Sequence, residues 1–152
     1  MKDFCKNIDM NAIKNAIRIG SVIVMACFFF PFYTVSCGVQ TVELSGADLA
    51  KGIENATEPA PIVYGLLLLA AAILVVTFVA KLKPYHVVIE LVGAGAGLVY
   101  MILIHSGVVN KLKELGASSS EISEGLSIEL GFWGCVIGFG MIAVAALLEA
   151  KK

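Results

Sequence analysis

The chain has 152 residues, 59% of them hydrophobic, and a mean hydropathy of +0.90. Soluble domains are roughly 45–50% apolar, so this composition excludes an ordinary soluble domain. Charged residues make up 15% of the chain and the net charge is -1, which excludes the broad basic surface of a nucleic-acid-binding protein. We therefore expect a small membrane protein whose solvent is the lipid bilayer.

The first apolar segment follows a basic N-terminal stretch and is predicted to be a membrane span over about 17–36. Asp9 is the expected N-cap of the helix that enters this span. As a helix the span reaches roughly 30 Å, enough for the hydrocarbon core, and it exceeds the roughly 7–15 apolar residues of a signal peptide. Pro31 lies near its far end and is expected to kink or end the helix.

The connection that follows, 37–61, has the pattern of a folded outer loop. Residues 39–44 alternate in a way that suits a short strand. Ser45 and Asp48 then form a candidate capping box for a short helix through Leu49, Ala50 and Ile53. The two prolines that close this loop are expected to end its local structure.

Three more apolar segments are predicted to span the membrane, over about 62–80, 87–105 and 128–148. The short basic turn before the third span makes the second and third spans antiparallel neighbours. The second outer loop, 106–127, contains apolar residues at helical spacing and a second candidate capping box at Ser118–Glu121. The fourth helix is therefore expected to begin near Ser119, before the membrane.

The distribution of lysine and arginine predicts the topology. Of the 11 basic residues, all but Lys51, Lys111 and Lys113 lie in the N-terminal segment, the 81–86 turn or the C-terminal tail. By the positive-inside rule both termini are expected in the cytoplasm of a cell-membrane protein. The predicted fold class is an all-α membrane protein of four transmembrane helices, with a small extracytoplasmic cap that the two outer loops form from a short strand and a short helix.

Glu90 is the most unusual residue, because it places a carboxylate about one turn inside the third span. Helical spacing puts His86, Glu90, Gly93 and Gly97 on one face, which should point into the packed interior. Ionisable groups inside spans are candidate sites for proton or cation transport. The alternative, which we favour, is a structural ion pair or hydrogen bond with His86, Arg18 or a nearby lysine.

Two pairs of glycines have the spacing of helix-packing motifs. Gly93 and Gly97 form one pair on the third span, and Gly134 and Gly138 form another on the fourth. We expect these two faces to meet each other or a neighbouring subunit. The glycines of the third span interrupt an apolar stretch, which excludes a dinucleotide-binding loop.

The four cysteines form no CxxC motif, so neither a zinc site nor a redox pair of the thioredoxin kind is indicated. Cys37 and Cys135 both lie near the outer boundary, where a disulfide is one alternative and free thiols are the favoured one. Cys27 is expected near mid-bilayer as a packing residue. No catalytic constellation, metal or cofactor is predicted.

The first outer boundary carries Pro31-Phe32 and Thr34–Gly38, followed by Leu44-Ser45-Gly46, Asp48-Leu49-Ala50 and Gly52. This pattern resembles that of small uncharacterised bacterial four-span membrane proteins. The resemblance implies a bacterial membrane location and a structural role for six residues of the loop: Pro31, Cys37, Gly38, Ser45, Gly46 and Asp48. Such proteins often carry an N-terminal zinc ribbon, but the lone Cys5 departs from it, so metal binding is not implied.

We expect a non-enzymatic membrane protein that acts through assembly. Its glycine faces and outer cap would contact a second copy of the chain or another membrane or envelope protein. The alternative is an oligomeric channel, or a small-solute or proton-coupled transporter, with Glu90 near its pathway. An enzyme is the third alternative, because no nucleophile, base and orienting group share a recognisable spacing.

Overall fold

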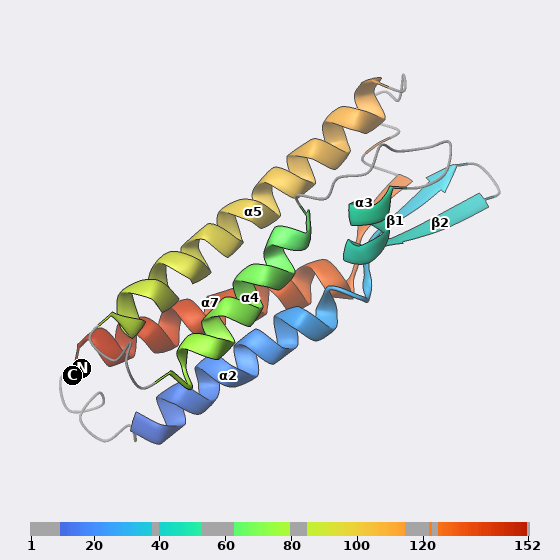
Figure 1. The fold of residues 1–152 in the computed structure, drawn as a ribbon. Helices are drawn as coiled ribbons and strands as arrows, with labels where there is room; N and C mark the ends of the chain where they lie inside the picture. The colour runs from blue at the N-terminus through green and yellow to red at the C-terminus, as the bar shows by residue number, and fades with distance from the viewer. Residues whose placement is uncertain are drawn as a thin grey trace.

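The structure is a computed structural model that describes residues 10–37, 40–52, 63–79, 85–114, 122 and 125–151. It is mostly helical, with a small three-stranded sheet at one end of a bundle (Figure 1). The long helices are α2 (Met10–Cys27), α4 (Tyr64–Val76), α5 (His86–Glu114) and α7 (Leu130–Ala150). They run alternately up and down, so that α2 and α5 each pack between α4 and α7.

The bundle core is formed by apolar residues that recur every three or four positions along each helix. On α7 these are Phe132, Cys135, Phe139 and Ile142, all buried. Glycines bring α2 and α7 into close contact, because a Cβ added at Gly20 would lie 2.9 Å from the Gly138 carbonyl oxygen.

The outward faces of the helices are also apolar. Helices α5 and α7 are each long and apolar enough to cross a membrane, and α4 is a shorter apolar helix. Side chains such as Leu68 on α4, Ile102 on α5 and Ile137 on α7 are more than half exposed. The helices of a water-soluble bundle carry polar residues at outward positions of this kind.

The sheet has the strand order β2-β1-β3, formed by β1 (Pro31–Cys37), β2 (Gln40–Ser45) and β3 (Leu126–Ile128). Strands β1 and β2 form an antiparallel hairpin, while β3 pairs antiparallel with the other edge of β1, with Tyr33 opposite Ile128. Helix α3 (Gly46–Lys51) follows β2 directly. The predicted short strand and short helix of the first outer loop are therefore both present.

The predicted capping box is confirmed. Ser45 Oγ accepts from the Asp48 backbone N–H at 3.2 Å, and the Asp48 carboxylate accepts from the Ser45 backbone N–H at 3.0 Å. The helix ends earlier than the predicted Ile53, because Gly52 has φ 77, a left-handed conformation that favours glycine and stops the helix.

The prediction that the first helix continues to residue 36 is wrong. Helix α2 ends at Cys27, the next three residues form a turn, and Pro31 begins a strand. Pro31 has no N–H with which to extend the helix, and the aromatic and β-branched residues after it favour extended backbone. Both edges of β1 then find partners, which satisfies its backbone groups. The helix starts at Met10, and the expected N-cap Asp9 lies outside the described residues.

The helical structure expected in the first part of the second outer loop is present, but the bounds of the elements differ from expectation. Helix α5 continues without a break to Glu114, so residues 106–114 belong to it rather than to a loop. Residues 126–128, predicted to be helical, form β3 instead, and α7 begins only at Leu130. Pairing with β1 and the bond from the Glu129 N–H to the Phe32 carbonyl oxygen, 2.9 Å, hold this segment extended. The Ser118–Glu121 capping box lies outside the described residues.

A candidate polar site at the basal end of the bundle

A polar cavity lies at the basal end of the bundle, which we define as the end opposite the sheet, where α2 and α5 begin and α4 and α7 end (Figure 1). Its volume is about 130 Å³, enough for a few water molecules. The lining residues come from three helices or their ends: Lys14, Val76, Thr77, Phe78, Val79, His86 and Glu90. The cavity thus brings together ionisable groups from α2 and α5.

Glu90 lines this cavity and is only 1% exposed. The prediction that it shares an inward face with Gly93 and Gly97 is confirmed, because both glycines are buried. Within the described part of the chain, its Oε2 atom has no hydrogen-bond partner. An ionised carboxylate in such a position is costly unless a proton or a cation compensates it.

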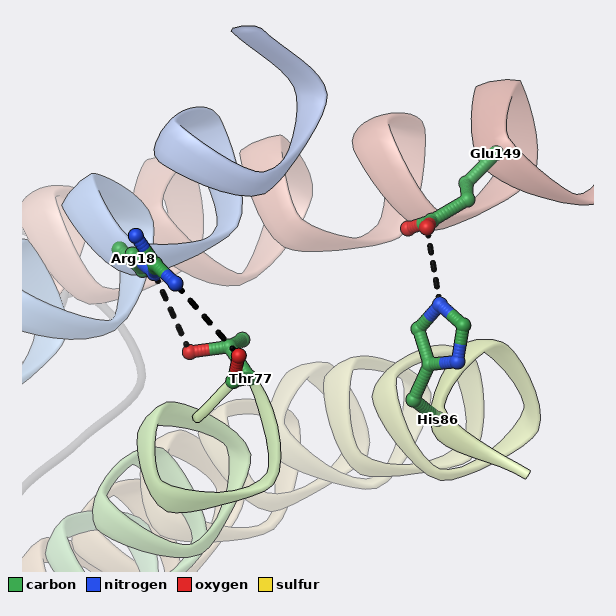
Figure 2. Close-up of polar contacts among 4 residues, drawn as sticks. All are labelled: Arg18, Thr77, His86 and Glu149. Atoms are coloured by element: carbon green, nitrogen blue, oxygen red, sulfur yellow. Dashed lines mark hydrogen bonds and ion pairs between the residues drawn. The ribbon is translucent and has the colours of Figure 1, made fainter. Parts of the chain in front are cut away.

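His86 contacts a second carboxylate, that of Glu149. Its Nε2 atom lies 2.8 Å from Oε1 of Glu149, which extends from the last turn of α7 (Figure 2). Glu149 is 9% exposed, and its Oε2 atom has no hydrogen-bond partner among the described residues. The carboxyl end of a helix disfavours a negative charge, so this position adds to the need for compensation.

Glu149 was not singled out from the sequence, where it sits in a charged tail beside two lysines. A signal was nevertheless present. Ile142, Ala145 and Ala146 form the buried face of α7, and Glu149 continues it by helical spacing. Its partner His86 lies on a different helix, so no local sequence pattern indicates that the two residues pair.

Arg18 was predicted as a partner of Glu90, but the structure places it elsewhere. It donates from Nε to Thr77 Oγ1 at 3.4 Å and from Nη2 to the Thr77 carbonyl oxygen at 3.5 Å (Figure 2). Its guanidinium also lies over the Phe78 ring, 4.3 Å from the centroid. Arg18 therefore caps the carboxyl end of α4, where a cation is favourable, and joins α2 to α4.

The predicted glycine faces are both covered within the chain. Gly97 faces Phe139 of α7, with 2.5 Å between an added Cβ and that ring, and Gly93 faces Ile73 of α4. Gly134 and Gly138 face α2, against Cys27 and Val24. The expectation that the two pairs meet each other is therefore wrong, because each pair packs against larger side chains of neighbouring helices.

The predicted structural residues of the outer loop lie in the sheet and its helix. Pro31 opens β1, Ser45 and Asp48 cap α3, and Gly46 packs so tightly on Phe28 that an added Cβ would lie 2.8 Å from its carbonyl oxygen. Cys37 is the last residue of β1, and Gly38 lies outside the described residues.

His105 joins the sheet to α5. Its Nδ1 atom lies 3.4 Å from the Tyr33 hydroxyl, and the two rings stack with centroids 5.9 Å apart. Tyr33 is fully buried, and burial raises the pKa of its phenol. These contacts fix the orientation of β1 on the bundle but provide no reactive group beyond the histidine.

The basal end of the bundle therefore brings several ionisable groups together. Lys14, His86 and Glu90 line the cavity, and Glu149 contacts His86 without lining it. No three His, Cys, Asp or Glu residues within the described ranges are placed to bind a metal ion. No protein-family model matches the chain, and no curated protein or solved structure matches it either.

Proposed function

We propose that the chain is a four-span membrane protein in which α2 and α4 cross the bilayer beside α5 and α7. Helix α2 is roughly 27 Å long and α4 roughly 20 Å, against a hydrocarbon core of about 30 Å. Ile19 and Val22 on α2, and Leu68 and Val75 on α4, are each more than half exposed and would lie in lipid. The basic residues Lys14, Arg18 and Lys151 lie at the basal end and support a cytoplasmic location for that end and for both termini.

Topology is tested with reporters fused after Lys152 and within the second outer loop. We expect a reporter that works only in the cytoplasm to be active at Lys152 and inactive in the loop. The reverse result would place the basal cavity on the opposite side of the membrane.

For the activity, we propose reversible proton binding at the basal cavity. The observation that supports it best is the Glu90 carboxylate, which is buried, faces the cavity and has an oxygen without a hydrogen-bond partner among the described residues. Glu149 provides a second such oxygen on the neighbouring helix. Two carboxylates with one histidine and one lysine are most easily neutralised by an added proton, and intramembrane carboxylates commonly serve as proton sites.

Buried side chains separate the proposed site from the sheet. Between the cavity and the sheet, the interior is filled by fully packed side chains such as Ile73, Phe139 and Met101. A proton that enters from the cytoplasm would therefore leave by the same route. This geometry favours a protein whose helix packing responds to cytoplasmic protons over a pore through a single bundle.

Infrared difference spectroscopy tests proton binding directly. Acidification of the purified protein in lipid nanodiscs should produce the carbonyl band of a protonated carboxylic acid, and Glu90→Gln should remove part of that band. Glu114→Gln is the matched control, because it changes an exposed glutamate at the far end of the same helix. Identical spectra for the original chain and Glu90→Gln would refute the proposal.

Self-association is a second candidate, and one observation favours it. An apolar groove of about 380 Å³ lies between α2 and α7, lined by small residues that include Ala12, Ala16 and Gly140. The groove would accept a helix of a second copy, since small residues allow close helix contact in lipid. Gly140→Leu should then lower the oligomeric state measured in mild detergent. Gly95→Leu is the control and should leave the oligomeric state unchanged. An added Cβ at Gly95, as at Gly140, meets nothing within 4 Å, so the two changes differ only in their position relative to the groove.

A further inference from the structure

Two cysteines lie at the contact between α2 and α7 near the sheet. Cys27 is the last residue of α2, and Cys135 lies in the second turn of α7. Both are free thiols. Helices α2 and α7 form the most extensive helix–helix contact in the bundle. Among the described residues, no other helix or strand therefore separates the two thiols.

The sulfur atoms occupy the same layer of this contact. The Cys27 sulfur fills the space above Gly134, the residue directly before Cys135. The Cys135 sulfur lies 3.7 Å from the carbonyl oxygen of Val24, one turn before Cys27 on α2. That same carbonyl oxygen accepts from the N–H of Phe28, which directly follows Cys27. The sulfur atom of each cysteine therefore lies beside the backbone of the helix that carries the other cysteine.

The glycines of this contact bring the backbones of α2 and α7 close together. A disulfide requires two Cα atoms about 4.4–6.8 Å apart, which is closer than typical helix packing allows. Small residues permit such an approach, and α2 and α7 meet through Gly20, Gly134 and Gly138. Any larger residue at position 134 would displace the Cys27 side chain.

The two thiols differ in access. Cys135 is fully buried, whereas Cys27 is partly exposed at the edge of the bundle. An oxidant from outside the bundle would therefore meet Cys27 first. This asymmetry resembles the division between an attacking and a resolving cysteine in thiol–disulfide exchange.

We propose that Cys27 and Cys135 form a reversible disulfide by exchange with a small disulfide. The Cys27 thiolate attacks one sulfur of that molecule, a mixed disulfide forms, and the first small thiol leaves. The Cys135 thiolate then attacks the Cys27 sulfur, which forms the Cys27–Cys135 bond and releases the second small thiol. The protein loses two protons and two electrons, and the small disulfide takes up both as two thiols. The bond would fix the end of α2 to α7 beside the sheet.

The test uses the full-length chain with Cys5 and Cys37 replaced by serine, treated with a dipyridyl disulfide in mild detergent. We expect release of two pyridinethiones per chain and an intact mass lower by two hydrogen atoms, both reversed by a reductant. Cys135→Ser should release one pyridinethione and retain one pyridyl adduct. Cys27→Ser should react at least tenfold more slowly, because only the buried thiol remains.

Two retained adducts per chain, or no reaction before unfolding, would overturn the proposal. So would equal reaction rates for Cys27→Ser and Cys135→Ser. The unsubstituted chain provides an independent measurement: after oxidation and proteolysis, a linked peptide pair that contains Cys27 and Cys135 is expected. A pair that joins Cys135 to Cys37 instead would contradict the assignment.

Discussion

The close contact of α2 with α7 predicts a large effect from a single methyl group at Gly138. A Cβ added there would lie 2.6 Å from Val24 Cγ2 and 2.9 Å from the Gly20 carbonyl oxygen. Val24 is fully buried and the carbonyl belongs to the backbone, so neither atom can easily move away. Overpacking of this kind costs about 1–3 kcal/mol. We expect Gly138→Ala to lower the free energy of unfolding by this amount, less the gain from replacing glycine in a helix.

The matched control is Gly95→Ala on α5, where an added Cβ meets nothing within 4 Å. The free energy of unfolding of this variant should rise by about 0.5–1 kcal/mol, because alanine loses less backbone entropy than glycine when a helix forms. Both free energies are measured by reversible unfolding in mixed detergent micelles. Equal stabilities for Gly138→Ala and Gly95→Ala would refute the close contact between α2 and α7.

Four further predictions concern three polar contacts. Ser45→Ala should destabilise α3 by about 1 kcal/mol, measured by hydrogen exchange of its amides, because the N-cap bond is lost. The hydrogen bonds from Ser45 lower the pKa of Asp48 below its usual 3.8, so their stabilisation is complete above that value and is lost as the pH falls through the lowered pKa. Asp48→Asn should remove this acid-dependent step in amide exchange. Replacement of His86 and Glu149 by leucine, singly and together, should show a coupling of roughly 0.5–3 kcal/mol in unfolding experiments, because the single change at His86 removes a hydrogen bond from the buried Glu149 carboxylate. Additive effects would argue against the bond. Tyr33→Phe should cost about 0.5–1.5 kcal/mol by loss of its hydrogen bond to a histidine, and an unchanged unfolding free energy would show that this bond contributes nothing.

The basal site shows which structural features a single residue in the sequence can predict and which it cannot. Glu90 stood out because a carboxylate in an apolar stretch is costly, and that cost exists whatever the neighbouring helices are. Arg18 was a reasonable partner by depth, but rotation of α2 directs it to the end of α4. Depth along a helix follows from residue number, whereas the direction of a side chain toward a particular neighbour depends on how the helices pack.

The sequence by itself determined the features that depend on near neighbours. These are the apolar character of the helices, the capping box of Ser45 and Asp48, and the inward face of Glu90. Each rests on spacings of three or four residues, over which the chain has little freedom once a helix forms.

Only the tertiary structure decided where α2 ends, that β3 is a strand, and that His86 meets Glu149. Residues 33 and 128 become partners because four antiparallel helices return the chain to the same end of the bundle. Strand pairing and burial of this kind depend on segments far apart in sequence, and the backbone bonds gained in the sheet outweigh the local preference for a longer helix.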